Sequence, residues 1–263
     1  MFAIINLGDF MKIEGVKKQK NGKYKITFDN KETLSTYDDV ILNNGLLFKK
    51  EIDSDLLDKL NIETSYYEVY NKAVSFISRK LRSEKEVRLF LDKTAVSNSD
   101  KQKIMKKLKE IGLINDKVFA SAYIQDRFNL STDGPFKIIS DLKKNNINDE
   151  VISDYISKIA DKDIYEKLAK LIIKKINANH NKSNYQLSQK IIGDMINLGY
   201  SKEMIVEILN DNLKKNSSVI NGEYNKLYRK LSNKYEGEEL ERHIRNKLFQ
   251  KGFSSDEINS IER

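Results

Sequence analysis

The sequence contains no cysteine, no tryptophan and a single proline among its 263 residues. The absence of thiols excludes disulfides, zinc–cysteine clusters, iron–sulfur sites and cysteine nucleophiles. Long hydrophobic runs are missing too: the stretch from Phe2 to Leu7 is far shorter than the roughly 20 residues of a membrane-spanning helix. Asp9 ends this run, and no small-residue cleavage site follows, as a secretory signal would require. We therefore expect a cytoplasmic protein with no membrane contact.

Motifs of common catalytic sites are also missing. The sequence has no P-loop, no GxGxxG and no GxSxG. Its two histidines, His180 and His243, have neither HExxH spacing nor a metal-binding companion. Paired carboxylates such as Asp38-Asp39 suit helix N-termini, where negative charge offsets the macrodipole. We expect no enzyme activity, no catalytic residue, no metal and no cofactor.

Charge, in contrast, is abundant and unbalanced. Charged residues make up 33% of the chain and hydrophobic residues 39%, with a net charge of +8. This composition is too apolar for a disordered chain and suits long amphipathic helices. The positive charge fits an anionic partner, such as nucleic acid or an acidic protein groove, but a codon bias toward Lys, Asn and Ile explains it equally well. Because bias would spread lysines evenly, their placement matters more than their number.

The region from residue 11 to about 62 has the pattern of a small α+β module. Tyr24, Ile26 and Phe28 alternate with polar residues, and Asn21-Gly22 precedes them. This pattern predicts a β-hairpin with a type I′ turn. Met11 resembles the start of a chain, which leaves the first ten residues open as an upstream extension.

Two short helices are predicted to complete this module. Thr36 stands three residues before Asp39 and predicts a helix start, with Gly45 placed to end that helix after Asn43. A second short helix begins at Asp53 or Ser54 and includes three leucines, Leu56, Leu57 and Leu60.

From residue 65 onward, apolar residues recur at helical spacings of three and four. Four segments repeat one pattern, in which a helix ends at a Gly or Asn corner and an apolar residue follows. The corners are Gly112, Asn146, Gly199 and Gly252. Gly and Asn adopt the left-handed conformation that closes a helix. After the last three corners come the N-cap residues Asn148, Ser201 and Ser254, and then the core residues Ile152, Ile205 and Ile258.

A preceding helix completes each group as a three-helix repeat. These helices are predicted at Tyr66 to Leu81, Asp116 to Phe128, Asp161 to Asn177 and about Asn221 to Tyr235. One such group would be marginally stable, so we expect the repeats to stack into an elongated, curved array with a continuous core. The predicted organisation is an α+β module over 1–62 and repeats over 63–115, 116–160, 161–213 and 214–263, the last more divergent. The fold class is mostly α.

The most informative local stretch runs from Ser78 to Val87. Ser83 with Glu86 predicts a capping box, which places Arg79 and Arg82 in the last turn of the preceding helix. Arginines there can bond the free carbonyls and complement the helix dipole. Alternatively, they act as forks for phosphate or carboxylate groups on an exposed corner. Both interpretations remain open.

This stretch and its continuation resemble the RecX family of recombinase regulators. The first-repeat pattern is Ala73-x2-Phe76-Ile77-x-Arg79-x2-Arg82-Ser83-x2-Glu86-Val87-x3-Leu91. It continues as Ile104-x3-Leu108-x2-Ile111-Gly112-Leu113-Ile114-Asn115-Asp116-x2-Phe119-Ala120-x2-Tyr123-Ile124-x2-Arg127, and the second repeat as Gly134-Pro135-x-Lys137-Ile138-x3-Leu142. The likeness covers about residues 65–263, and the hairpin-bearing front resembles the longer, Gram-positive members. Val87 replaces the family's usual leucine and Asn146 its usual corner glycine.

The resemblance implies a role in homologous recombination, DNA repair and the SOS response. RecX proteins bind the RecA filament along its groove and dampen its ATPase and strand exchange, so the expected partner is the RecA filament, with single- or double-stranded DNA as a further partner. We expect a monomer that inhibits RecA. The candidate contact residues are Arg79, Arg82, Lys85, Arg88, Lys103, Lys106, Lys107, Arg127 and Lys137. The alternative function is a stand-alone nucleic-acid-binding protein with helix-turn-helix-like repeats.

Overall fold

The computed structural model describes residues 10–179, 182–213 and 217–261. It divides into two compact units, residues 1–119 and 120–263. The proposed N-terminal extension, apart from Phe10, lies outside the described residues, as does His180.

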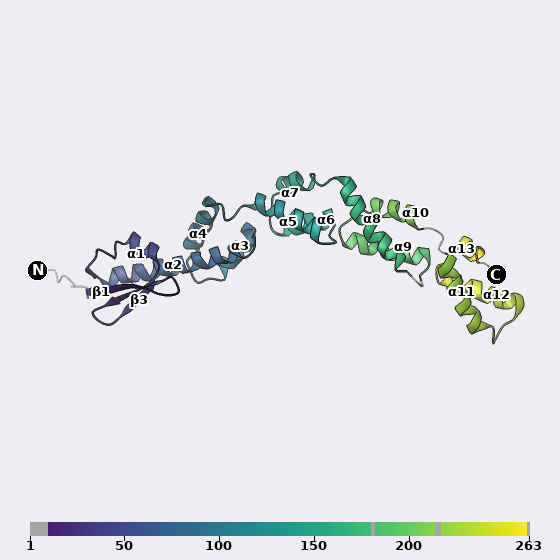
Figure 1. The fold of residues 1–263 in the computed structure, drawn as a ribbon, viewed down its shortest axis with the longest axis horizontal. Coiled ribbons are helices and arrows are strands. Elements are labelled where there is room, and N and C mark those ends of the chain that lie inside the picture. The colour runs from purple at the N-terminus through teal and green to yellow at the C-terminus, as the bar shows by residue number, and fades with distance from the viewer. Residues whose placement is uncertain (1–9, 180–181, 214–216, 262–263) are drawn as a thin grey trace, which may run out of the picture. The chain divides into compact units, whose positions relative to one another are not determined.

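A four-stranded antiparallel sheet, in the order β3-β2-β1-β4, begins the first unit (Figure 1). Its strands are β1 (Met11–Lys18), β2 (Tyr24–Phe28), β3 (Thr33–Thr36) and β4 (Glu51–Ile52). One face buries Ile26, Phe28 and Leu34 against α1 (Asp38–Asn43) and the beginning of α2 (Ser54–Ser78). The hairpin and the α+β character of this module are confirmed.

The turn of the hairpin differs from the predicted type I′. Gly22 has a positive φ of 84°, but Asn21 does not, and a type I′ turn needs both. The amide of Gly22 donates to the carbonyl of Gln19, and the amide of Gln19 donates to the carbonyl of Lys23. This is a three-residue loop in which a turn is followed by a left-handed glycine. The Asn-Gly signal located the turn correctly but not its length.

The role predicted for Thr36 is wrong. Thr36 ends strand β3, is fully buried, and its hydroxyl lies 2.6 Å from that of Thr64 on α2. Tyr37 occupies the N-cap position of α1 instead. A buried partner on another element therefore outweighs the local capping preference. Gly45, with a φ of 61°, follows the end of α1 as predicted.

The helix α2 joins two segments that were predicted as separate helices. Asp53 caps it, accepting from the amide of Leu56 at 2.7 Å, as predicted. The helix then continues for 25 residues to Ser78, so the short helix predicted at its start does not end near residue 62. Its first part packs on the sheet through Leu60 and Tyr67, and its second part packs on the first repeat through Ala73 and Ile77.

Helices make up the rest of the described chain. The first repeat continues with α3 (Glu84–Asp92) and α4 (Asn98–Glu110), and the second has α5 (Asp116–Leu130), α6 (Pro135–Lys144) and α7 (Asp149–Ile156). The third has α8 (Asp161–Asn177), α9 (Asn184–Asn197) and α10 (Lys202–Asn212), and the fourth α11 (Ser217–Leu231), α12 (Gly237–Gln250) and α13 (Ser255–Asn259). The mostly α fold with tandem three-helix repeats is confirmed.

All four corner residues have a positive φ, from 59° at Asn146 to 87° at Gly199. However, Gly112 does not occupy the same place as the others. Asn146, Gly199 and Gly252 each join the second and third helices of a repeat, whereas Gly112 follows the third helix of the first repeat and leads into α5. In the first repeat, the joint between second and third helices is formed by residues 93–97, which contain no glycine. The left-handed conformation of Gly112 was predicted correctly, but its position relative to the three helices of the first repeat was not.

The second and third repeats meet backbone to backbone inside the second unit. The amide of Gly134 donates to the carbonyl of Leu198 at 2.6 Å, and that of Phe136 donates to the carbonyl of Gly199 at 3.0 Å. A Cβ on Gly134 would lie 2.6 Å from the oxygen of Gly199. Glycine at both positions therefore allows this close approach.

Candidate functional site

The corner between α2 and α3 carries the first of the predicted contact residues. The hydroxyl of Ser83 caps α3 by accepting from the amide of Glu86, and the carboxylate of Glu86 accepts from the amide of Ser83 at 3.0 Å. The predicted capping box is therefore confirmed. Arg79 is the C-cap residue of α2. Arg82 lies beyond the end of that helix, not in its last turn as predicted, because α2 ends at Ser78.

Arg82 is held against the corner by two contacts. Its guanidinium lies 4.1 Å from the centre of the Phe76 ring and donates to Glu86 at 3.0 Å. Only 21% of its side chain is exposed, and within the described residues its buried Nε has no hydrogen-bond partner. These contacts favour a structural role for Arg82, as a clamp between the aromatic ring and the capping box.

Arg79 is placed differently. Within the described residues its exposed side chain has no ion-pair partner. It borders a shallow hollow of about 250 Å³ that is also lined by Lys72, Ser75, Phe76 and Phe90. The rings of Phe76 and Phe90 stack with centroids 4.7 Å apart and are only partly buried. An unpaired guanidinium thus stands beside an accessible aromatic pair.

Glu84, on the first turn of α3, contacts three other residues and was not predicted as a site residue. Its carboxylate accepts from Arg88 at 2.8 Å and from Lys109 of α4 at 2.7 Å. The bond from Lys109 is the main cause that holds the pKa of Glu84 below its usual value. Its amide donates to Asp116, which ties α3 to the start of α5. Arg88 is therefore engaged, and Lys85 lies half-buried beside it.

On α4, the predicted lysines face carboxylates and tyrosines. Lys103 pairs with Asp100 at 3.0 Å, and Lys106 approaches Glu110 at 3.8 Å. Lys107 lies over the rings of two tyrosines of α2, 4.5 Å from the centre of Tyr70. The three side chains are close in sequence but have different partners.

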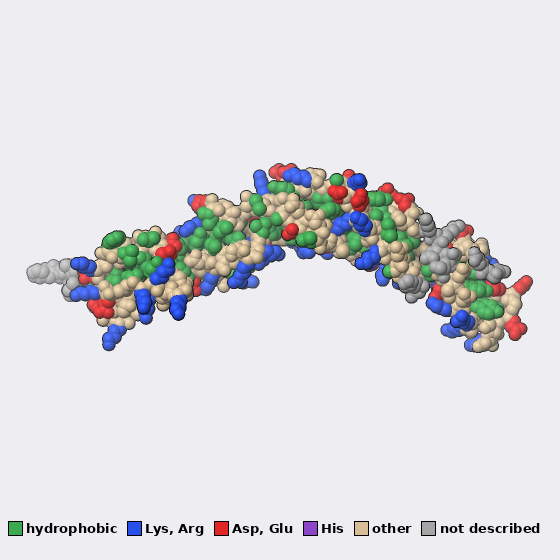
Figure 2. Space-filling model, viewed as in Figure 1, with side chains coloured by type: hydrophobic (Ala, Val, Ile, Leu, Met, Phe, Trp, Pro, Cys, Tyr) green, Lys and Arg blue, Asp and Glu red, His purple; other side chains and the backbone are tan. Residues whose placement is uncertain are grey.

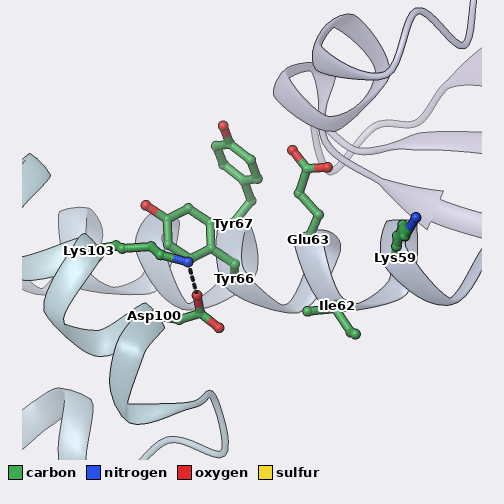
Figure 3. A pocket seen from close by; sticks show the side chains of 7 residues that line it. All are labelled: Lys59, Ile62, Glu63, Tyr66, Tyr67, Asp100 and Lys103. Atoms are coloured by element: carbon green, nitrogen blue, oxygen red, sulfur yellow. Dashed lines mark hydrogen bonds and ion pairs between the residues drawn. The ribbon is translucent and has the colours of Figure 1, made fainter. Parts of the chain in front are cut away.

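Lys103 and Asp100 also border a pocket of about 320 Å³ between α2 and α4 (Figure 3). The other lining residues are Lys59, Ile62, Glu63, Tyr66 and Tyr67. Glu63 accepts from Asn44 at 2.7 Å, and burial raises the pKa of Tyr66. Glu63, Tyr67, Asp100 and Lys103 are engaged in hydrogen bonds or ion pairs with neighbouring side chains.

In the second repeat, Arg127 and Lys137 converge on Asp133. The carboxylate of Asp133 is buried, with Lys137 at 2.6 Å and Arg127 at 3.5 Å. Burial raises the pKa of Asp133, but the bonds from Lys137 and Ser131 and the charge of Arg127 outweigh it, and the net pKa is below the usual value. Arg127 and Lys137 therefore neutralise the buried carboxylate in the loop before α6.

Asp133 and two further residues of this junction were not predicted from the sequence. Lys167 of α8 donates to the carbonyls of Phe128 and Asp133, at 2.5 and 2.9 Å, and burial lowers the pKa of its amine. The hydroxyl of Tyr200 donates to the carbonyl of Thr132 at 3.3 Å, and burial raises the pKa of Tyr200 to about 12. The only signal in the sequence is that Asp133 precedes a Gly-Pro helix start and lies one turn before Lys137.

The remaining candidate chemistry is limited. His243 stacks on Tyr235 with ring centroids 4.0 Å apart and lies 3.9 Å from Glu239 of its own helix. Among the described residues, no group of three or more His, Cys, Asp or Glu side chains is placed to hold a metal ion. No helix in the described part of the chain is long and apolar enough to cross a membrane.

Known proteins resemble the chain over nearly its whole length. It is 29% identical to the regulatory protein RecX of Listeria welshimeri over 257 residues, 95% of each chain. It is 29% identical to the regulatory protein RecX of Streptococcus uberis, over 95% of this chain and 98% of that one. No family model matches the chain.

Two solved structures are similar as well. The crystal structure of RecX from Lactobacillus salivarius is 30% identical, with a TM-score of 0.51, and the match covers 56% of this chain and 96% of that one. A second crystal structure of regulatory protein RecX has a TM-score of 0.63 at 22% identity, over 76% of this chain and 99% of that one. The second likeness concerns the fold alone.

Proposed function

We propose that this chain, which belongs to the RecX family of RecA regulators, binds the RecA–DNA filament and inhibits the ATPase and strand exchange of the recombinase. It acts as a cytoplasmic monomer and contacts the filament through its helical repeats. Tandem repeats can engage successive subunits of a polymer, and each added contact raises the overall affinity. Inhibition at less than one molecule per RecA monomer follows from that arrangement.

The exposed α2–α3 corner is the observation that carries this proposal. Arg79 is unpaired among the described residues and stands next to the stacked rings of Phe76 and Phe90. Arginine and aromatic side chains are enriched among the residues that dominate protein–protein binding. A partly buried ring pair next to a free guanidinium suits an acidic and apolar protein surface better than a DNA backbone. We therefore assign this corner to RecA.

The test is inhibition of the DNA-dependent ATPase of RecA by purified protein. Arg79→Ala should raise the concentration needed for half-maximal inhibition by about fivefold or more, the loss of one interface arginine worth roughly 1–2 kcal/mol. Arg229→Ala is the matched control, because Arg229 is exposed in the last turn of α11. Equal losses in both variants would contradict the assignment to the α2–α3 corner. No inhibition by the parent protein at saturation would end the proposal itself.

The alternative, DNA binding by helix-turn-helix-like repeats, has weaker support. At least six of the nine candidate cations have a carboxylate partner among the described residues, which lowers their availability for phosphates. They are Arg82, Arg88, Lys103, Lys106, Arg127 and Lys137. A DNA affinity that falls steeply with salt and is lost when these six are neutralised would favour the alternative.

A further inference from the structure

A cluster of lysines on the N-terminal hairpin has no role in the proposed contact with RecA. Residues 15–28 include five lysines and no acidic residue. They are Lys17, Lys18, Lys20, Lys23 and Lys25. Lys23 bonds Glu68 of α2 at 3.1 Å, which ties the hairpin to the helix. The other four are exposed and, within the described residues, have no carboxylate partner.

Two of these lysines are directly opposed across the sheet. Lys17 of β1 is the register partner of Lys25 of β2, on the face away from the buried residues Ile26 and Phe28. Like charges in directly opposed positions destabilise a sheet. Lysines often guard the edges of sheets against aggregation. That explanation fails for Lys25, because β2 lies between β3 and β1 and has no free edge.

The surface around this pair is rich in small residues, most of them with hydroxyl groups. Gly15, Thr27, Thr33 and Ser35 share the outer face, and a Cβ on Gly15 would meet nothing within 4 Å. Figure 2 shows blue basic side chains along the strand side of this module and green hydrophobic ones over its helix side. Small hydroxyl residues beside lysines can approach and bond phosphate oxygens.

We propose that the outer face of the N-terminal sheet binds the phosphodiester backbone of double-stranded DNA, without sequence specificity, through Lys17, Lys25 and the neighbouring lysines of the turn. Single-strand binding surfaces generally stack bases on exposed aromatic rings. The aromatic residues of the hairpin region, Tyr24 and Tyr37, are half-buried and lie against Lys18 and Lys23. Within the described strands β1 to β3, the outer face carries charge but no aromatic residue, so a duplex fits it better than a single strand.

The inference deepens the proposed function and rests on it only for its biological setting. A regulator that contacts RecA through its repeats would contact DNA through a separate module of the same chain. DNA binding by this face is measured without RecA, and inhibition of RecA is measured separately. Failure of one is therefore distinguishable from failure of the other.

The experiment compares the full chain with Lys17→Gln/Lys25→Gln by fluorescence anisotropy on a labelled duplex over a range of salt concentrations. Each lost phosphate contact lowers the slope of log affinity against log salt by about 0.9, so the slope should fall by about 1.8 and the affinity about tenfold or more near 0.1 M salt. Lys143→Gln/Lys162→Gln removes the same charge from lysines that pair with Asp149 and Glu166. This control should bind nearly as the parent does.

Two further measurements make the result decisive. The melting temperature of Lys17→Gln/Lys25→Gln should equal or exceed that of the parent, because an opposed charge pair has been removed. A single strand of the same sequence should bind more weakly than the duplex. An unchanged salt slope, an equal loss in the control pair, or single-strand binding as tight as duplex binding would each overturn the proposal.

Discussion

Three glycines in the repeats show two different reasons why alanine would destabilise the fold, namely a left-handed backbone and a steric clash of the added methyl group. Gly112 has a φ of 75° with nothing within 4 Å of a built Cβ. Gly134 has an ordinary φ of −91°, but its Cβ would lie 2.6 Å from the carbonyl oxygen of Gly199. Gly199 combines a φ of 87° with a Cβ only 2.3 Å from the amide nitrogen of Lys137. Alanine at Gly112 thus tests the cost of the backbone conformation, alanine at Gly134 the cost of the steric contact, and alanine at Gly199 both together.

We predict that alanine at these positions destabilises the protein in a fixed order. Gly112→Ala should cost about 1–2 kcal/mol for the left-handed backbone. Gly134→Ala should cost about 1–3 kcal/mol, because backbone groups must move apart. Gly199→Ala should cost most, about 3 kcal/mol or more. Urea denaturation gives these free energies, and Gly193→Ala, inside α9 with open space around it, should be neutral or slightly stabilising. A cost at Gly199 no larger than at Gly112 would contradict the close packing of the second and third repeats.

The carboxylate of Asp133 gives a second prediction at this scale, for acid pH. Its pKa is lower in the folded than in the unfolded chain, so its stabilising effect is present above about pH 4 and is lost as the pH falls through the folded value. Asp133→Asn should lower stability at pH 7 by about 1–2 kcal/mol, with a smaller difference from the parent at pH 3. Denaturation at both pH values measures this. The exposed partner of Lys143 allows a control, Asp149→Asn, which should change little at either pH.

Individual residues were predictable where their role is local. The caps Ser83, Ser201 and Ser254 and the left-handed corners follow from backbone hydrogen bonding within a few residues, and the structure confirms them. Asp133 could not be recognised, because its partners become apparent only when α5, α6 and α8 are packed. Nor could the pairing of six candidate cations be foreseen, since carboxylates are frequent all along the chain.

At the scale of elements, the length of α2 is the main departure from expectation. The sequence changes texture near residue 62 because the helix leaves one core and enters another, not because it ends. Periodicity finds the helix on each side but cannot show that the backbone continues through the exposed residues between them. Strand β4 was missed for a related reason, since two residues are too few to show a pattern.

The continuity of α2 can be tested with proline at Ile62, which is 66% exposed. Ile62→Pro should cost about 3 kcal/mol or more and reduce the helical circular dichroism signal, because proline removes a helix hydrogen bond and clashes with the preceding turn. Ile62→Ala at the same position should be nearly neutral, since its side chain is largely in solvent. Equal stability of the two variants would indicate that a linker, not a helix, crosses this position.

At the scale of the whole molecule, buried side chains among the described residues form separate clusters in the N-terminal module and in the first, third and fourth repeats. Stability in repeat proteins is approximately a sum of unit and neighbour contributions. A cavity in one cluster should therefore loosen that cluster first. Ile244 in α12 is fully buried in the fourth repeat, so Ile244→Ala should cost about 2–5 kcal/mol there.

Hydrogen exchange with mass spectrometry measures where this cost appears. In Ile244→Ala, peptides from α11 and α12 should lose protection, and peptides from α8 should keep theirs. A matched cavity, Ile172→Ala in α8, should reverse the pattern. Equal loss of protection in both regions would mean that the second unit unfolds as a single cooperative body.

The uninterrupted helix α2 has a mechanical consequence for a regulator with two proposed contact faces. Lys23 of the hairpin forms an ion pair with Glu68 of α2, and Arg79 is the C-cap residue of the same helix. The two residues of α2 are eleven positions apart, which is roughly 16 Å of axial rise. The helix is unbroken between these two points, so it holds Glu68 and Arg79 at a fixed distance along its axis. Any polymer that engages both faces must therefore offer its own two docking points at a fixed separation.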